Sequence, residues 1–378
     1  MSDYEVAIVG AGVVGLACAA RLAARWPGRV LVLERHEGIC REASSRNSEV
    51  VHAGIYYPTG SLKALTCVRG RRMLVKRCRD LGIPLLACGK VIVASAADQL
   101  PALEELLAQG RANDVEGLEV IDAERLRQLE PGTRGVGALW SPASAVVDSH
   151  QLAASLEAEA AHHGADLVFG AEVVGVEPAD GGYGLTVTQG EETTTVSAAR
   201  VVNAAGLGAD TLSTMVGIDI DGAGYRQYAC KGTWWSIAPR HNHRLSRLVY
   251  PVGRAEDPGL GIHGCFDAAG GMRLGPDFVF VEAGDDGVDL SVPEAARAKF
   301  LAAGQRLFPW LEAEDLSPDM AGLRAKLVPA PKQWRDFVVA EESARGLPGW
   351  VTLVGIESPG LTAAMALAEV VGQRLSSS

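Results

Sequence analysis

The stretch Glu5-Val-Ala-Ile-Val-Gly10-Ala-Gly12-Val-Val-Gly15 decides the fold of this chain. Residues 6–9 form an apolar run typical of a buried strand, and residues 13–25 carry apolar side chains at helical spacing. The glycines suit a tight turn (Gly10), a close approach of the backbone to a pyrophosphate (Gly12) and close packing of the helix on the strand (Gly15). Because the start of the helix also offers free N–H groups and a positive dipole end, we predict a dinucleotide site.

An acidic residue supports this prediction. A second apolar run, residues 30–33, ends at Glu34, which lies 19 residues after Gly15. An acid at this place accepts hydrogen bonds from the ribose hydroxyls of a dinucleotide. The competing interpretation is a glycine turn with a purely structural role. That interpretation does not explain why an acidic residue, Glu34, follows the second apolar run. The motif by itself does not distinguish NAD from FAD.

Two further segments favour FAD. The loop 43–48, Ala-Ser-Ser-Arg-Asn-Ser, is dense in hydroxyl and amide groups that suit a pyrophosphate, a ribityl chain and a flavin edge. Near the C-terminus, residues 350–355 read as a strand, 356–360 as a tight loop and 361–375 as an alanine-rich helix. The start of that helix would face the flavin N1–O2 edge and favour the anionic reduced ring. We therefore expect FAD and no metal.

The residues expected at FAD come from these motifs and from neighbouring strand ends. They are Gly10, Gly12, Val14, Gly15, Glu34, Arg35, Ser44, Ser45, Asn47, Ser48, Val173, Ala205, Gly206, Gly355, Ser358, Gly360, Leu361 and Thr362.

The composition sets further limits. A chain of 378 residues is too long for one ordinary domain, and 48% apolar residues are ample for two cores. The net charge of −11, without a lysine–arginine cluster, argues against a nucleic-acid partner. The seven cysteines are odd in number and form no C-x-x-C pair, so we expect reduced thiols rather than disulfides or a metal site. No apolar stretch approaches a membrane span, so we expect a cytoplasmic protein and leave open a peripheral contact with the inner face of the membrane.

The order of the expected elements predicts a discontinuous arrangement. Helical periodicity covers residues 62–81, 99–113, 123–129, 148–163 and 293–308, and strand patterns cover 89–94, 171–177, 183–189, 193–197 and 200–203. Residues 225–281 are rich in short strands, aromatic residues and glycine. We predict an α/β fold with an α+β substrate part. A Rossmann-like FAD/NAD(P)-binding domain would comprise residues 1–85, 145–215 and 332–378, and a β-rich substrate domain residues 86–144 and 216–331.

The segment 47–58, Asn-Ser-Glu-Val-Val-His-Ala-Gly-Ile-Tyr-Tyr-Pro, closely resembles the L-2-hydroxyglutarate dehydrogenase/oxidase family, which belongs to the D-amino-acid-oxidase-like FAD enzymes. The resemblance extends over nearly the whole chain, with matches at residues 61–64, 67–70, 88–94, 250–252, 261–263, 274–276 and 358–362. It implies FAD-dependent oxidation of an L-2-hydroxy acid to the 2-oxo acid, without a nicotinamide cofactor. Three departures leave a close relative of L-2-hydroxyglutarate open as the substrate. They are Ala53 where the family often has serine, Lys-Gly-Thr-Trp-Trp at 231–235 in place of a pattern with arginine and tyrosines, and Glu357 before the Ser-Pro-Gly turn.

Oxidation of an alcohol by hydride transfer to flavin N5 requires a base for the hydroxyl proton. A positioned base contributes about 10²- to 10⁴-fold, and histidine has an unperturbed pKa of about 6.5. His263 follows the segment Gly-Leu-Gly-Ile in the expected substrate domain, and His52 lies in the loop after the serines expected at the flavin. We predict that one of them is the base, with His263 as the first choice. The competing interpretation for each is a hydrogen-bonded structural histidine.

A dicarboxylate substrate also needs cationic partners, because two unpaired buried carboxylates would be very costly. Arg324 has a guanidinium group whose two-pronged geometry suits a carboxylate. The other candidates share a cationic or hydroxyl head group: Lys231, Lys90, Tyr56, Tyr57 and Tyr250. Each candidate also has a structural interpretation, as an ion pair or as core packing.

Three functional interpretations stay open. The first is a 2-hydroxy acid dehydrogenase that passes electrons to a quinone, a carrier protein or oxygen. The second is an amino-acid or secondary-amine oxidase, which needs no strong base because a neutral amine already carries a lone pair; the histidines therefore favour the alcohol. The third is a flavoprotein whose flavin only organises a binding surface, which the concentrated polar and aromatic loops disfavour.

Overall fold

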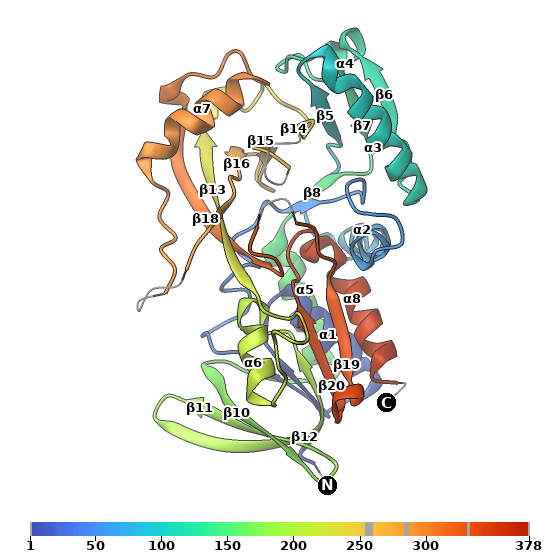
Figure 1. The fold of residues 1–378 in the computed structure, drawn as a ribbon, viewed down its shortest axis with the longest axis vertical. Helices are drawn as coiled ribbons and strands as arrows, with labels where there is room; N and C mark the ends of the chain where they lie inside the picture. The colour runs from blue at the N-terminus through green and yellow to red at the C-terminus, as the bar shows by residue number, and fades with distance from the viewer. Residues whose placement is uncertain (1, 254–259, 283–286, 331–332, 377–378) are drawn as a thin grey trace.

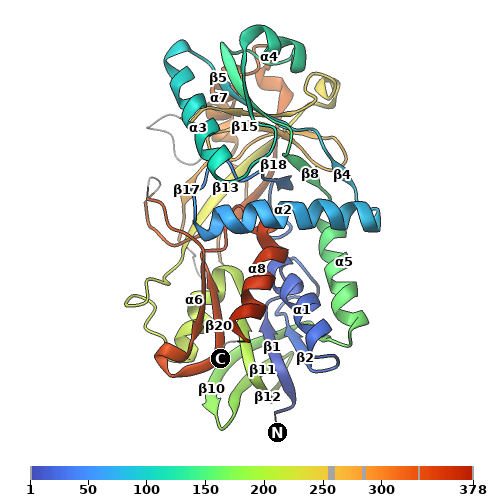
Figure 2. The ribbon, with the colours of Figure 1, turned by 90° about the vertical axis from the view of Figure 1, so that its right-hand side faces the viewer.

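Two large sheets occupy opposite halves of the molecule, and helix α2 crosses between them (Figures 1 and 2). The structure is a computed structural model that describes residues 2–253, 260–282, 287–330 and 333–376. The helices are α1 (Val13–Arg25), α2 (Leu62–Leu81), α3 (Leu100–Ala112), α4 (Ala123–Leu129), α5 (Ser149–His162), α6 (Ala209–Met215), α7 (Arg297–Gln305) and α8 (Gly360–Arg374).

The first sheet has eight strands and contains the predicted glycine turn. Its strands are β1 (Tyr4–Val9), β2 (Val30–Leu33), β9 (Asp166–Val168), β10 (Ala171–Ala179), β11 (Gly182–Gln189), β12 (Glu192–Asn203), β19 (Val338–Glu342) and β20 (Leu347–Val354). Strands β9, β2, β1, β12 and β20 lie parallel in that order. Their carboxyl ends therefore meet at one edge, where doubly wound sheets bind their ligands.

Apolar cores on both faces explain why β1 and β2 are continuous apolar runs rather than alternating ones. One core packs α1, α5 and α8 against the sheet, and the other includes α6, β10 and β11. Figure 2 shows α8 and α1 beneath α2, in the half of the molecule that carries both chain termini.

The second sheet has nine strands and lies in the other half. Its strands are β5 (Lys90–Ala94), β6 (Glu119–Asp122), β7 (Gly137–Ser141), β13 (Tyr228–Ile237), β14 (Leu248–Pro251), β15 (His263–Phe266), β16 (Met272–Gly275), β17 (Val279–Phe280) and β18 (Leu316–Lys326). Only β5 and β14 pair in parallel among its described strands. A small sheet of β3 (Val50–Val51), β8 (Ala145–Val147) and β4 (Leu85–Leu86) completes the set.

The predicted α/β fold class is confirmed, and the α2 prediction matches residue for residue. One strand prediction was wrong: residues 193–197 and 200–203 form the single strand β12, because its first part pairs with β11 and its last part with β1 and β20. The domain boundaries stay a prediction, and the one at 331/332 lies outside the described residues. All seven cysteines are free. None of the helices in the described parts of the chain is long and apolar enough to cross a membrane.

Candidate active site

The turn between β1 and α1 leaves no space for side chains at two of its glycines. Gly10 has a φ of +105°, and a Cβ there would lie 2.6 Å from the Ala204 carbonyl oxygen. A Cβ on Gly15 would collide with the carbonyl oxygen of Gly10. Glycine at position 10 therefore lets the turn lie against the end of β12, and glycine at position 15 lets α1 lie against the turn.

The start of α1 carries no side-chain cap from its N-cap residue, Gly12. The Val13 N–H donates to the Ser44 hydroxyl at 3.0 Å, so the predicted polar loop 43–48 does reach the helix start. Within this loop the Asn47 side chain donates to the Ser44 carbonyl at 2.7 Å and accepts from the Glu49 N–H at 2.7 Å. The Asn47 amide thus holds the loop in place.

Glu34 lies at the same edge as the glycine turn and is only 7% exposed. Its carboxylate accepts from the Ala11 N–H at 2.7 Å and the His36 N–H at 2.9 Å, which fixes its orientation. Two other residues that the sequence predicts at FAD have different contacts. Arg35 is exposed and forms an ion pair with Glu42. The Val173 side chain packs in an apolar core of β10 and β11.

The C-terminal loop 355–360 meets the end of β12 at this edge. Gln227, which the sequence analysis missed, accepts from the Gly355 N–H at 2.7 Å and donates to the Gly206 carbonyl at 2.9 Å. Helix α8 then starts at Gly360 without a side-chain cap, and the N–H groups of Gly360 and Ala363 donate to the carbonyls of Glu357 and Pro359. The N–H groups of the two residues between them have no acceptor in the described chain, so they are open to an anionic or polar ligand.

These residues fit FAD. The uncapped starts of α1 and α8 follow two strands of the same parallel sheet, and the crowding at Gly10 and Gly15 is what the dinucleotide turn requires. The turn 10–15, Ser44 and Glu34 would hold the pyrophosphate and a ribose, and the start of α8 would face the flavin. The Thr362 hydroxyl accepts from the His52 N–H at 3.0 Å and donates to the Val50 carbonyl at 3.3 Å, so only its backbone is free for the cofactor.

Five predicted residues from four separate segments, the loop after β3 and strands β5, β14 and β15, converge next to the start of α8. We call them the buried polar cluster: His52, Tyr56, Lys90, Tyr250 and His263. All except Tyr56, which is half-buried, are buried residues. Three of their polar atoms are fully enclosed and have no hydrogen-bond partner in the described chain, namely His52 Nδ1, Tyr56 Oη and His263 Nε2. Buried polar atoms normally have partners, so this cluster points to a missing polar ligand.

His263 has the hydrogen-bond pattern of a base. Its Nδ1 lies 2.8 Å from the Gly261 carbonyl, which can only accept, so Nδ1 carries the proton and Nε2 keeps its lone pair. The ring stacks on Tyr250 at a centroid distance of 3.6 Å and meets Trp234 edge-on at 5.5 Å. Burial lowers the pKa of His263 to about 3, the Gly261 hydrogen bond opposes this shift, and Lys90 and Arg324 add to it. The ring is therefore neutral at physiological pH.

Lys90 is the cation of the cluster and is only 1% exposed. Its ammonium lies 3.8 Å from the Tyr250 ring centroid and 5.6 Å from that of Tyr56. No acidic side chain forms an ion pair with it in the part of the chain that the structure describes. Burial lowers the pKa of Lys90 to about 7.

His52 connects the cluster to the C-terminal loop. Its Nε2 lies 3.2 Å from the Ser358 hydroxyl, two residues before α8 begins. Burial lowers the pKa of His52 well below its usual value, and repulsion from Lys90 and His263 adds to this effect. The Tyr57 ring packs in a small apolar cluster with Ala64 and Cys67, and its hydroxyl is hydrogen-bonded to Ser358.

Arg324 and Lys231 do not act on one ligand. Strands β13 and β18 pair with Cys230 opposite Arg324, and because side chains alternate along a strand, Lys231 points to the other face. Arg324 donates to the Asp277 carbonyl at 3.0 Å and to the Cys230 sulfur at 3.4 Å. Lys231 donates to the Asp289 carbonyl at 2.6 Å. Of these two predicted cations, only Arg324 is among the groups whose charge lowers the pKa of His263.

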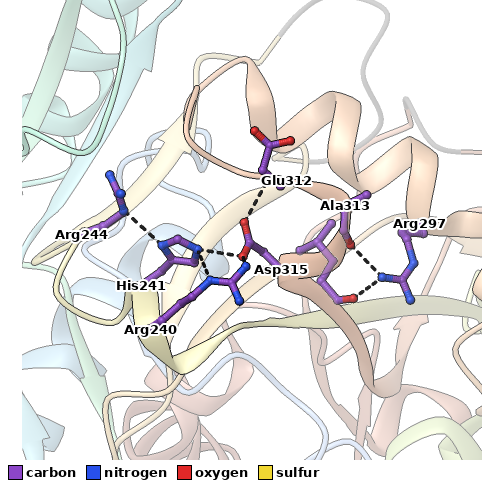
Figure 3. A network of polar contacts seen from close by, with 8 residues as sticks. Arg240, His241, Arg244, Arg297, Glu312, Ala313 and Asp315 are labelled. Carbon is purple, nitrogen blue, oxygen red and sulfur yellow. Dashed lines mark hydrogen bonds and ion pairs between the residues drawn. The ribbon is translucent and has the colours of Figure 1, made fainter.

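A third buried histidine illustrates the structural alternative (Figure 3). His241 accepts from Arg244 Nε at 3.1 Å, and its Nε2 lies 2.8 Å from the Asp315 carboxylate. Asp315 also accepts from the Glu312 N–H at 2.9 Å. Both ring nitrogens of His241 are satisfied, so this network fastens the turn after β13 to the start of β18 and leaves no group for a substrate.

Comparison with known proteins agrees with this geometry. The family described as FAD dependent oxidoreductase (DAO) matches residues 5–374. This chain belongs to that family. The mitochondrial L-2-hydroxyglutarate dehydrogenase of Arabidopsis thaliana is 35% identical over 98% of this chain and 83% of its own length. The L-2-hydroxyglutarate dehydrogenase of Escherichia coli (strain K12) is 29% identical over 89% of this chain and 85% of its own length. The L-alpha-glycerophosphate oxidase of Mycoplasma pneumoniae with FAD bound has a TM-score of 0.85 and 25% identity, covering 100% of this chain and 95% of that one. The predicted oxidoreductase class and FAD cofactor are thereby confirmed.

Replacing Gly12 with aspartate in this FAD-dependent oxidoreductase is expected to abolish cofactor binding while the protein still folds. Gly12 has an ordinary φ of −69°, so a side chain there does not strain the backbone, but a carboxylate would repel the pyrophosphate. Flavin absorbance per protein after gel filtration measures the loss, and Gly12→Ala is the uncharged control. Full flavin content in the aspartate variant would place the pyrophosphate elsewhere.

Proposed function

We propose that this FAD-dependent oxidoreductase oxidises L-2-hydroxyglutarate, or a close relative of it, to the 2-oxo acid. The relatives named L-2-hydroxyglutarate dehydrogenase support this substrate. The observation that carries the chemistry is the Nε2 of His263, which has no hydrogen-bond partner among the described residues. It is a neutral base in a buried cluster whose ammonium group, on Lys90, has no acidic partner in the same part of the chain.

The cluster suits the reacting end of a hydroxy acid. Lys90 would bind the carboxylate next to the hydroxyl group, and Tyr56 offers a hydroxyl for a further hydrogen bond. His263 Nε2 would accept the proton of the substrate hydroxyl group as the hydride leaves the carbon that carries this group. Bound FAD supplies the hydride acceptor, at its N5 atom. Burial of the cluster excludes water from the reacting atoms.

Anaerobic mixing with a panel of substrates tests this function. L-2-hydroxyglutarate should bleach the flavin faster than its D-enantiomer, lactate or any amino acid in the panel. Faster bleaching by an amino acid or a secondary amine would instead establish the amine oxidase, the second interpretation of the sequence. If no panel member bleaches the flavin, the protein is not an oxidase of either class.

The electrons must then leave the flavin, and we propose a quinone, a carrier protein or oxygen as their acceptor. A peripheral contact with the membrane belongs to the quinone case. Mixing the reduced enzyme with air, or with a soluble quinone, separates the oxidase from the dehydrogenase by the rate of flavin reoxidation.

Arg324→Ala is expected to raise KM strongly for the dicarboxylate and leave FAD bound. Arg324 donates to a backbone carbonyl and a thiol, both neutral, so its charge is available to a substrate carboxylate. Truncating one partner of a buried charge pair weakens binding by roughly 30-fold or more. Steady-state kinetics and flavin content measure both effects. An unchanged KM would remove Arg324 from the substrate site.

A further inference from the structure

Three charged residues that the sequence analysis did not place at the substrate meet beside the active site. We call them the lysine bridge: Lys63 at the start of α2, Lys326 at the end of β18 and Glu357 in the loop before α8. One carboxylate oxygen, Glu357 Oε1, accepts from Lys63 at 3.0 Å and from Lys326 at 2.6 Å. The side chains of Lys63, Glu357 and Lys326 are 5%, 10% and 15% exposed.

The lysine bridge has an excess of positive charge. Two ammonium groups share one carboxylate, so one positive charge has no partner within the bridge. Holding such a charge away from water is unfavourable unless an anion joins it. Arg324 adds a second charge without an acidic partner among the described residues, since it donates to a carbonyl and a thiol.

Arg324 and Lys326 form one cationic surface. They lie two residues apart on β18, and side chains at this spacing point to the same face of a strand. Both head groups lie over the Phe278 ring, Arg324 Cζ at 5.3 Å and Lys326 Nζ at 5.5 Å from its centroid. A Cβ on Gly232 would collide with the Arg324 guanidinium, so glycine at this place on β13 leaves room for the arginine.

This surface lies close to the reacting end of the site. His263 on β15 pairs with Gly275 on β16, and Arg324 donates to the carbonyl of Asp277, two residues further along the chain, at 3.0 Å. Glu357 is followed directly by Ser358, whose hydroxyl contacts His52. The cations therefore form two groups around the histidines: Lys90 on β5, and Arg324 with Lys326 on β18.

We propose that Lys326, held between Glu357 and Phe278 beside Arg324, selects substrates that carry a second carboxylate. The substrate would place its hydroxyl and first carboxylate at His263 and Lys90, and its remote carboxylate between Arg324 and Lys326. Glu357 fixes the ammonium of Lys326 in position, and Lys63 offsets the charge of Glu357, so that Lys326 keeps a charge for the ligand. This specificity rests on the proposed function.

The test compares two substrates that differ only at the remote end: L-2-hydroxyglutarate and its C5 amide, which has nearly the same shape without the remote charge. Lys326→Met should lower kcat/KM for the diacid by roughly 30-fold or more and change that for the amide by less than about threefold. Lys326→Arg should retain most of the preference for the diacid, because it keeps the charge. Lys76→Met, on the exposed face of α2, is the control for general effects of losing a lysine.

A binding experiment separates this inference from the proposed function. Glutarate and its monoamide are not oxidised, and their binding can be followed by the change in flavin absorbance. The wild type should bind glutarate more tightly than the amide, and Lys326→Met should lose that preference with its flavin content intact. If neither hydroxy acid bleaches the flavin of the wild type but the wild type shows this binding pattern, the proposed function is wrong. The inferred role of Lys326 in selecting a second carboxylate is then still supported. If Lys326→Met keeps the wild-type preference in both experiments, Lys326 only fastens the loop and the inference is overturned.

Discussion

Replacing His263 with alanine should slow anaerobic reduction of the flavin by roughly 10²-fold or more, the usual effect of losing a general base. FAD should stay bound, because His263 lies on β15, in the sheet opposite to the glycine turn. The direct reason is the free Nε2, which the Gly261 carbonyl orients by binding Nδ1. Stopped-flow measurement of flavin absorbance gives the rate.

The pH dependence provides a second test of the same residue. Burial lowers the pKa of His263 to about 3, so the free enzyme keeps this base unprotonated at any pH well above that value. The wild-type kcat/KM for flavin reduction should therefore show no acid limb from about pH 8 down to about pH 5, a range in which an ordinary histidine would titrate. An acid limb of the wild-type profile at about pH 6.5, where the rate falls as the pH is lowered, would exclude His263, whereas deprotonation of Lys90 would lower the rate only as the pH is raised.

His52→Ala is the matched variant, because His52 is also buried with one unpartnered ring nitrogen. If His52→Ala stops flavin reduction while His263→Ala does not, the two roles should be exchanged. If both variants reduce flavin at nearly the wild-type rate, neither His263 nor His52 is the base and the proposed mechanism is wrong. His241→Ala should affect stability but not this rate, since its ring nitrogens already have protein partners.

Replacing Lys90 with methionine should stabilise the fold and inactivate the enzyme at the same time. The ammonium is almost fully buried without an acidic partner among the described residues, and holding such a charge away from water costs free energy that an apolar side chain of similar length does not. The same change removes the cation proposed for the reacting carboxylate, so kcat/KM should fall. Thermal unfolding with saturating FAD and steady-state kinetics measure the two effects.

The gain in stability should depend on pH. The pKa of Lys90 is lowered from 10.5 to about 7, so between these values the unfolded chain binds a proton that the folded chain does not. Wild-type stability therefore rises with pH across this window, and the advantage of Lys90→Met should be largest below pH 7 and vanish above about pH 10.5. Arg77→Met removes a mostly buried cation that does have an acidic partner, Glu159, and should lower the melting temperature. A destabilised Lys90→Met would show that Lys90 has an anionic partner in the folded protein.

Local patterns in the sequence were sufficient for the cofactor half of the molecule. The turn 10–15 can be recognised from neighbouring residues alone, because its glycine spacing lies between an apolar strand and the helix that follows it. Crowding at Gly15 is local, since its Cβ would collide with the Gly10 carbonyl, whereas crowding at Gly10 comes from Ala204 at the end of β12. Helix α2 was predicted with both ends correct, since Ser61 caps its start and Gly82 ends it in a left-handed conformation. Glu34 could be placed for the same reason, at the end of a short apolar strand.

The substrate half depended on tertiary structure. The sequence determined which residue types were available, including two histidines and several cations, but pairing between distant strands decided which of them meet. The register of β13 against β18 turns Lys231 away from Arg324, and a shift of one residue would have reversed that result. The lysine bridge joins residues 63, 326 and 357, from α2, β18 and the loop before α8, so no local pattern could show that they share one carboxylate oxygen. Side-chain alternation is local, whereas the choice of strand partner is not, and this is why the sequence determined the FAD-binding turn while only the tertiary structure decided the arrangement of charges around His263.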